Sequence, residues 1–167
     1  MIDEIKQCLH QTSDSLLANG SMSPRTWTSS IKTAFTDLAY SKSLWICCNR
    51  TESDLSTTEW LWDIVIYESD CPKGSTRGKL QLILESEYNS NPDRILEDIQ
   101  KLFVGRASLR CYVFFSGGLD HRNQLFKYIG DLISSNPNVE ASDEYLIAGW
   151  SSDQQGFEFR LLKKESE

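Results

Sequence analysis

The sequence lacks a long hydrophobic run and an excess of positive charge, and each absence excludes a class of protein. No apolar stretch approaches the ~18 residues that a membrane-spanning helix needs, so no membrane partner is expected. Residues 1–6 are charged and amphipathic, unlike the apolar segment of a secretory signal. The net charge of −7 argues against a protein that coats nucleic acid through bulk charge, because phosphate contacts need clustered Lys and Arg. We therefore expect a cytoplasmic protein.

Three kinds of site are also missing from the sequence. The five cysteines are odd in number and form no CxxC pair, so neither a disulfide framework nor a zinc site is indicated. His10 and His121 are isolated and fit no metal-ligand pattern. Gly117-Gly118 is typical of a turn, since no GxxxxGK[ST] phosphate-binding loop is present.

The length and composition predict one globular domain over residues 1–167. Apolar residues make up 40% of the chain and charged residues 25%, which is ordinary for a protein with a single hydrophobic core. Ser23-Pro24 and Asn91-Pro92 are strong helix starts, with a capping side chain followed by proline. The predicted helices cover residues 2–18, 23–41, 91–104 and 120–134, the last with Asp120 as its cap. The predicted strands cover residues 44–48, 60–67, 80–88, 110–116, 145–150 and 157–162.

This order of elements predicts an α/β fold. The strand–helix–strand unit at its centre favours a mixed central sheet flanked by helices on both faces. Two helices precede the sheet, and the last two strands surround residues 153–156, which is typical of a C-terminal β-hairpin.

The chemistry of the chain is most visible in its acidic residues on apolar strands. Strand residues alternate between faces, so Glu85 and Glu87 point to one side while Leu82 and Leu84 point to the other. Carboxylates on such a strand are costly unless they are paired, hydrated or bound to a metal. Asp63 lies within another apolar strand, and it can face the two glutamates if the strands are neighbours. Three convergent carboxylates would make a site for Mg²⁺ or Mn²⁺, which take oxygen ligands.

The region from Pro24 to Ser116 resembles the core of the PD-(D/E)XK, or restriction-endonuclease-like, superfamily. That core has a helix, an acid on a strand, an acid-x-Lys or related motif on the next strand, then a helix and a strand. The matching residues are Asp63 and Glu85-Ser86-Glu87. Three further segments, residues 84–88, 98–102 and 106–110, resemble a bacterial branch of that superfamily with a Glu-Ser-Glu motif.

The resemblance implies roles for these residues. Asp63 and Glu85 would hold the metal, which would activate a water and stabilise charge on the scissile phosphate. The third motif position is normally Lys and is Glu87 here; some members of the superfamily carry Glu there as a base or further ligand. Other members move the Lys to the following helix, for which Lys101 is the candidate.

The function implied by the resemblance is a Mg²⁺-dependent endonuclease that hydrolyses DNA phosphodiester bonds, as a homodimer and in a bacterial or phage-defence setting. Arg106 and Arg110 are candidates for binding substrate phosphate, or else for partnering nearby acids. The rival hypothesis is a non-catalytic module on a degenerate nuclease scaffold that binds or regulates a protein partner. The acidic composition and the absence of Lys at the third motif position favour this rival. A DNA-mimicking inhibitor is a weaker third hypothesis, because the carboxylates are scattered rather than gathered in a block.

A structural interpretation also exists for each acidic residue. Glu85 and Glu87 could lie on the solvent face of an edge strand, and Asp63 could cap a loop or pair with Arg50. Glu59, just before the Asp63 strand, could assist a metal or be solvated.

Lys101 has a structural interpretation as well. At ~100° per residue, Lys101 falls nearly opposite the buried stripe of its helix, which predicts a solvated side chain paired with Glu97.

Overall fold

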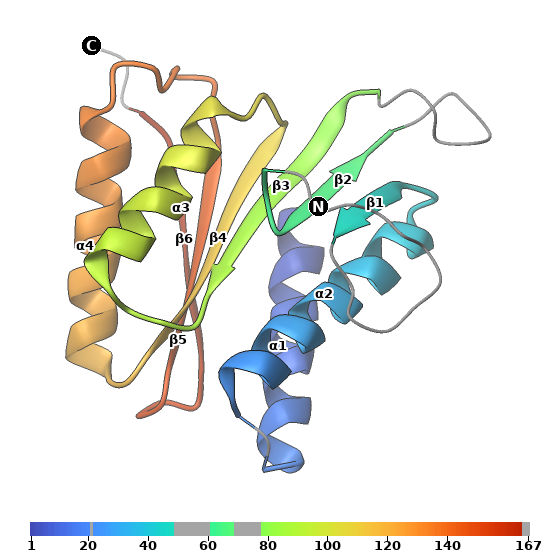
Figure 1. The fold of residues 1–167 in the computed structure, drawn as a ribbon, viewed down its shortest axis with the longest axis vertical. Helices are drawn as coiled ribbons and strands as arrows, with labels where there is room; N and C mark the ends of the chain where they lie inside the picture. The colour runs from blue at the N-terminus through green and yellow to red at the C-terminus, as the bar shows by residue number, and fades with distance from the viewer. Residues whose placement is uncertain (21, 49–60, 69–77, 165–167) are drawn as a thin grey trace.

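The computed structural model describes residues 1–20, 22–48, 61–68 and 78–164, and the following account concerns those residues. Four helices flank one open six-stranded mixed sheet, which confirms the predicted α/β class (Figure 1). The helices are α1 (Ile2–Ala18), α2 (Pro24–Ser41), α3 (Pro92–Val104) and α4 (Leu119–Ser135). The strands are β1 (Trp45–Cys48), β2 (Ile64–Tyr67), β3 (Leu80–Glu87), β4 (Leu109–Ser116), β5 (Tyr145–Ser151) and β6 (Gly156–Leu162).

The strands lie side by side in the order in which they occur in the chain, from β1 to β6. β2 is antiparallel to β1 and to β3, whereas β3, β4 and β5 run parallel to one another. Parallel neighbours need a crossover, and α3 and α4 supply the two that this sheet requires. β5 and β6 are antiparallel neighbours, which confirms the predicted C-terminal hairpin.

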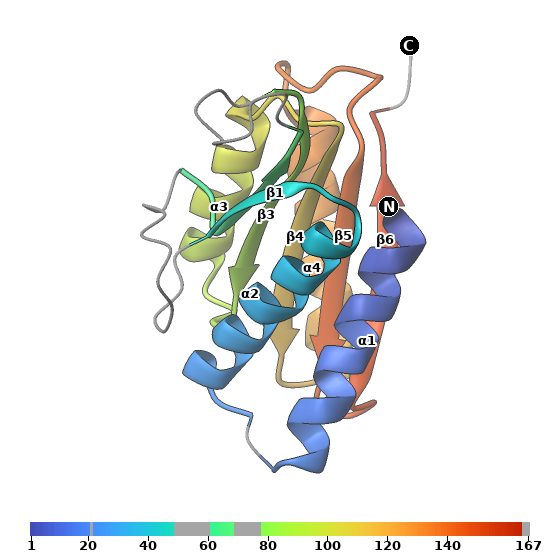
Figure 2. The same ribbon diagram turned by 90° about the vertical axis from the view of Figure 1, so that its right-hand side faces the viewer.

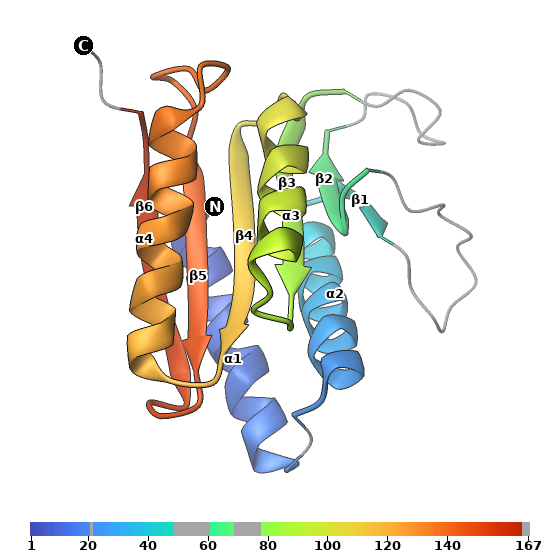
Figure 3. The same cartoon turned by 60° about the vertical axis from the view of Figure 1, so that its left-hand side comes forward.

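The two faces of the sheet carry different pairs of helices. α1 and α2 cover one face (Figure 2), and α3 and α4 cover the other (Figure 3). The alternation along β3 follows this division: Leu82 and Leu84 join the core under α1 and α2, whereas Ile83 joins the core under α3 and α4. Glu85 therefore belongs to the α3 side of the sheet.

Two of the predicted helix starts are confirmed in detail. Ser23 and Thr26 form a reciprocal capping box at the start of α2, and the Asn91 side chain accepts the backbone N–H of Asp93 at the start of α3. The predicted cap of α4 is wrong. Gly118 takes the cap position, and Asp153 of the β5–β6 turn accepts the backbone N–H of Leu119 at 2.9 Å.

The start of β2 also differs from its prediction. The strand begins at Ile64, since residues 61–63 form a bend, while Trp60 lies outside the described residues. The indole N–H of Trp62 donates to the backbone carbonyl of Lys101 at 2.9 Å, so this bend is tied to the end of α3. Gly105 makes the approach possible, because a Cβ there would lie 2.1 Å from Ile83 Cδ1 and 2.8 Å from Trp62.

None of the helices in the described ranges is long and apolar enough to cross a bilayer. The cysteines in those ranges, Cys8, Cys47, Cys48 and Cys111, are free thiols. Burial raises the pKa of the Cys8 thiol to about 11 and that of Cys111 further still, so both remain protonated at neutral pH.

A candidate acidic site between β2, β3 and α3

Asp63 lies at the start of β2, directly beside the end of β3. Ile64 pairs with Leu84 in the antiparallel register, so one further step of that register places Asp63 opposite Glu85. One carboxylate oxygen of Asp63 accepts the backbone N–H of Ser86 at 2.9 Å, and the other lies 3.5 Å from Nζ of Lys32 on α2. Asp63 is therefore fixed by two other elements. Its alternative partner Arg50, and the neighbouring Glu59, lie outside the described residues.

Glu85 is a buried carboxyl group beside the ammonium group of Lys101. Only 3% of the residue is exposed, and its Oε2 lies 3.7 Å from Nζ of Lys101, while Oε1 is buried with no hydrogen-bond partner among the described residues. Burial, reinforced by the negative charges of Asp63 and Asp98, raises the pKa of Glu85 to about 9 against the opposing effect of Lys101. The carboxyl group is thus largely protonated at neutral pH. A cation that attracts the carboxylate more strongly than Lys101 does would displace this proton. The interpretation of Glu85 as a solvent-facing residue does not fit this burial.

Asp98 on α3 is a second acidic partner of Lys101. It is not among the site residues predicted from the sequence. Its Oδ1 accepts from Nζ of Lys101 at 2.8 Å, and the residue is buried among the apolar contacts of α3. Burial raises the pKa of Asp98 despite the Lys101 hydrogen bond, which lowers it. Burial lowers the pKa of Lys101, but the hydrogen bond to Asp98 and the charge of Glu85 outweigh this effect and the net shift is upward.

The position of Asp98 in the sequence contained a signal that could have identified it. Asp98 stands beside Ile99 and three residues after Ile95, within the buried stripe of an amphipathic helix, where an acid needs a partner. Lys101 follows three residues later, at a spacing that allows contact on a helix. The long lysine side chain therefore reaches back to Asp98 and Glu85, although the helical wheel predicted that it would face solvent.

Glu87 and Tyr112 lie at the margin of the group. Oε1 of Glu87 accepts the backbone N–H of Asn89 at 2.6 Å, so this carboxylate is engaged by the turn after β3. The Tyr112 hydroxyl on β4 is buried and has no hydrogen-bond partner in the part of the chain that the structure describes. Burial raises the pKa of Tyr112 well above its usual value, and the charges of Asp98, Glu87, Glu85 and Asp63 add to the effect. We call these four acids, with Lys32, Lys101 and Tyr112, the acidic cluster.

The two arginines proposed for substrate phosphate are engaged elsewhere. Arg106 is exposed and pairs with Glu140 at 2.8 Å. Arg110 is buried and pairs with Asp143 at 3.0 Å, and its Nε donates to the backbone carbonyls of Leu102 and Gly105 at the C-terminal end of α3. The structure therefore brings Asp63, Glu85 and Lys101 together but not Arg106 or Arg110, which have acidic partners.

The donor set of the acidic cluster fits a magnesium ion in part. Within the described ranges, no group of three or more His, Cys, Asp or Glu residues is arranged to hold a metal ion. Mg²⁺ does not require such a group, because it keeps several waters and is commonly bound by one or two carboxylates together with substrate phosphate. Asp63 and Glu85 supply two carboxylates, and Oε1 of Glu85 has no partner within the described ranges. The four acids also outnumber the two lysines, so a further cation would be favoured electrostatically.

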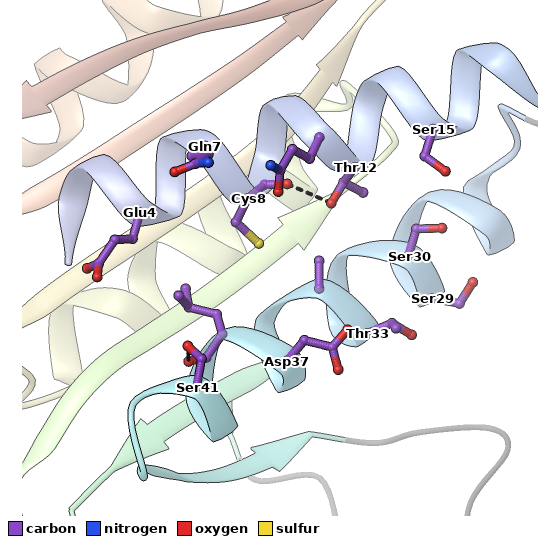
Figure 4. A pocket seen from close by; sticks show the side chains of 13 residues that line it. Glu4, Gln7, Cys8, Thr12, Ser15, Ser29, Ser30, Thr33, Asp37 and Ser41 are labelled. Atoms are coloured by element: carbon purple, nitrogen blue, oxygen red, sulfur yellow. Dashed lines mark hydrogen bonds between the residues drawn. The ribbon is translucent and has the colours of Figure 1, made fainter.

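A concave feature lies on the opposite face of the sheet from the acidic cluster, between α1 and α2 (Figure 4). This open groove has a volume of about 660 Å³ and is lined mainly by hydroxyl and amide side chains, with Cys8 at its floor. The Glu4 carboxylate at one end pairs with Lys42 and the terminal ammonium group. The groove therefore lacks the concentration of acids found on the α3 side.

A scan of the chain against protein-family models, a search of curated proteins and a search of solved structures each gave no match. The geometry of the acidic cluster and the sequence pattern are therefore the features that indicate a function.

Proposed function

We propose that the chain is a divalent-metal-dependent nuclease that hydrolyses phosphodiester bonds of DNA, with Asp63 and Glu85 as metal ligands. The observation that carries the proposal is the convergence of Asp63, Glu85 and Lys101 from β2, β3 and α3. The Ser86 N–H on β3 donates to the Asp63 carboxylate, and Nζ of Lys101 lies 3.7 Å from Oε2 of Glu85. The order α2, β1–β3, α3, β4 also agrees with the order of elements that the sequence resemblance implies.

Different residues of the chain would have different roles in hydrolysis. A bound Mg²⁺ or Mn²⁺ would supply an activated water and would stabilise charge on the phosphate. Lys101 would stand in the place of the motif lysine and stabilise negative charge on the phosphate, while Asp98 keeps its ammonium group beside Glu85. Glu87, at the third motif position, would serve as a base or a further ligand once released from the Asn89 N–H.

Isothermal titration of Mg²⁺ and Mn²⁺, combined with nicking of supercoiled plasmid, tests this proposal on one set of samples. Glu85→Gln and Asp63→Asn keep side-chain size while removing charge, and Glu97→Gln is the control because Glu97 is an exposed acid on α3. We expect the wild type and the control to bind metal and nick DNA, and both cluster variants to lose both signals. Wild-type protein with neither signal would overturn the proposal.

A specific observation also favours the rival, a non-catalytic module that binds a protein partner. Lys32 and Lys101 already neutralise part of the acidic cluster, and protonation of Glu85 removes a further charge. Such a cluster can persist without metal. The rival predicts a folded wild type that binds no metal and nicks no DNA, with a thermal midpoint that Mg²⁺ does not raise.

A further inference from the structure

β6 is the edge of the sheet farthest from the acidic cluster, and its outer side has no strand partner among the described residues. The strand is seven residues long and pairs only with β5 in those ranges. Every residue of β5 is buried, whereas none of β6 is. A long edge strand with unpaired backbone groups is a template for another strand, because its N–H and C=O groups need partners.

The side chains of β6 are complementary to a second copy of the same strand. Antiparallel pairing about Phe159 would place Glu158 opposite Arg160 of the second copy, and Phe157 opposite Leu161. Opposite charges and apolar pairs directly across two strands are the favourable cross-strand combinations. The pairing is symmetric, so each contact occurs twice and the assembly closes at two chains.

The exposure of these residues agrees with that register. Leu161 is 45% exposed, one of the few large apolar side chains at the surface of the described ranges. Glu158 and Arg160 pair with each other within the chain at 3.1 Å, yet their side chains remain 36% and 40% exposed. Arg160 can therefore accept a second acidic partner from the outer side, and Glu158, which also pairs with Arg122, can accept a third cationic one.

The helices beside β6 keep its side chains in place without pairing its edge. The Arg160 guanidinium lies 4.3 Å from the centre of the Phe126 ring on α4, and Arg122 of α4 pairs with Glu158 at 2.7 Å. On the opposite face, the His10 ring of α1 contacts Phe159 edge-on at 5.2 Å. These contacts lie on the two faces of the sheet, so they leave the outer backbone edge of β6 to a further strand.

We propose that β6 is a homodimer interface, in which two copies pair antiparallel about Phe159 to form one continuous twelve-stranded sheet. The pairing does not depend on the nuclease proposal, since β6 contributes no residue to the acidic cluster. The partner is a second copy of this chain, because the charge pattern of the strand complements itself.

Sedimentation equilibrium of the full chain tests the interface, at concentrations up to roughly 100 µM, above the Kd of a moderate dimer. We expect a dimer for the wild type and a monomer for each of two β6 variants. Leu161→Lys removes the apolar contact with Phe157 of the second copy. Arg160→Glu places an acidic side chain opposite Glu158 of the second copy. Val104→Lys is the matched control, because Val104 is 68% exposed at the end of α3 and should leave the dimer intact. A monomeric wild type, a longer polymer, or a dimer that both β6 variants retain would overturn the proposal.

Cysteine cross-linking then tests the register. Phe159→Cys places two thiols directly opposite each other at about 5 Å between Cα atoms, within reach of a disulfide. Leu161→Cys places the two thiols about 13 Å apart along the paired strands, which is too far. We expect mild oxidation to link the first variant and not the second, with the unmodified chain as the baseline for its own cysteines. Linking of Leu161→Cys alone would contradict the register about Phe159.

Discussion

The carboxylate of Asp63 accepts the backbone N–H of Ser86 at 2.9 Å, so the acid that precedes β2 is bonded to β3 between its two glutamates. This bond uses a backbone donor, and it therefore fixes Asp63 whatever the protonation state of its neighbours. The position of Asp63 relative to Glu85 is set by the sheet rather than by flexible side chains. Both acids are consequently held in place before any ligand binds.

Glu85→Gln should reduce the dependence of stability on pH. Folding raises the pKa of Glu85 from 4.5 to about 9, so the folded state holds this proton more tightly than the unfolded state. The wild type should therefore lose stability as pH rises from about 4.5 to 9, by up to about 1.4 kcal/mol for each pH unit. Urea unfolding of both proteins between pH 5 and pH 8.5 measures the difference. If the unfolding free energies of the two proteins changed with pH in parallel, Glu85 would be ionised in the folded protein over this pH range.

Lys101→Met should destabilise the protein by about 1–3 kcal/mol, because it leaves the buried carboxylate of Asp98 without its cation. The double variant Lys101→Met with Asp98→Asn should recover part of that loss, since no charge is then left unpaired. Lys127→Met, which breaks an exposed pair with Asp131 on α4, is the control and should have little effect. Urea unfolding measures all four proteins, and a double variant no more stable than Lys101→Met would argue against the Lys101–Asp98 coupling.

Arg110→Met should cost about 3–5 kcal/mol, since Arg110 is the buried partner of Asp143 and also caps the end of α3. Arg106→Met should leave stability unchanged, because the Arg106–Glu140 pair is exposed. Thermal and urea unfolding give the comparison. A phosphate-binding role for Arg110 would instead appear as a folded variant of normal stability with weaker DNA binding.

Gly105→Ala should destabilise the protein by about 1–3 kcal/mol, because the added methyl group would overlap Ile83 and Trp62. Gly117→Ala is the matched control, since a Cβ at that position has no neighbour within 4 Å. Trp62 fluorescence should also shift in Gly105→Ala as the indole moves, although four other tryptophans contribute to the signal. Equal stability of the two variants would contradict the close approach at Gly105.

Local signals predicted most of the fold from the sequence. The two helix starts at Ser23 and Asn91 depend on side chains within a few residues, and both occur as expected. The predictions that failed depend on distant residues. Asp120 carries every local feature of a helix cap, but Asp153, from a turn 34 residues later, takes the N–H of Leu119 instead. No spacing rule within α4 could have predicted this bond.

The acidic cluster was predicted in the same partial way. Alternation along β3 placed Glu85 and Glu87 on one face, and Asp63 does lie beside that strand. Asp98 was missed, and Lys101, which the resemblance named as a candidate, was placed in solvent by the helical wheel, because a wheel describes only where Cβ atoms point. A lysine has four further rotatable bonds, and its ammonium group moves to the nearest buried carboxylates.

The strands lie in the sheet in the same order as in the chain, and this order bears on how the protein folds during synthesis. Lys32, Asp63, Glu85, Asp98 and Lys101 all precede residue 104, the end of α3. During synthesis, the N-terminal elements emerge first, and contacts between neighbours in sequence form fastest. We therefore expect the acids to assemble on a three-stranded meander while it is still open to water. Tyr112 of β4 is the register partner of Glu85, so we expect the burial of Glu85 to follow when β4 joins the sheet.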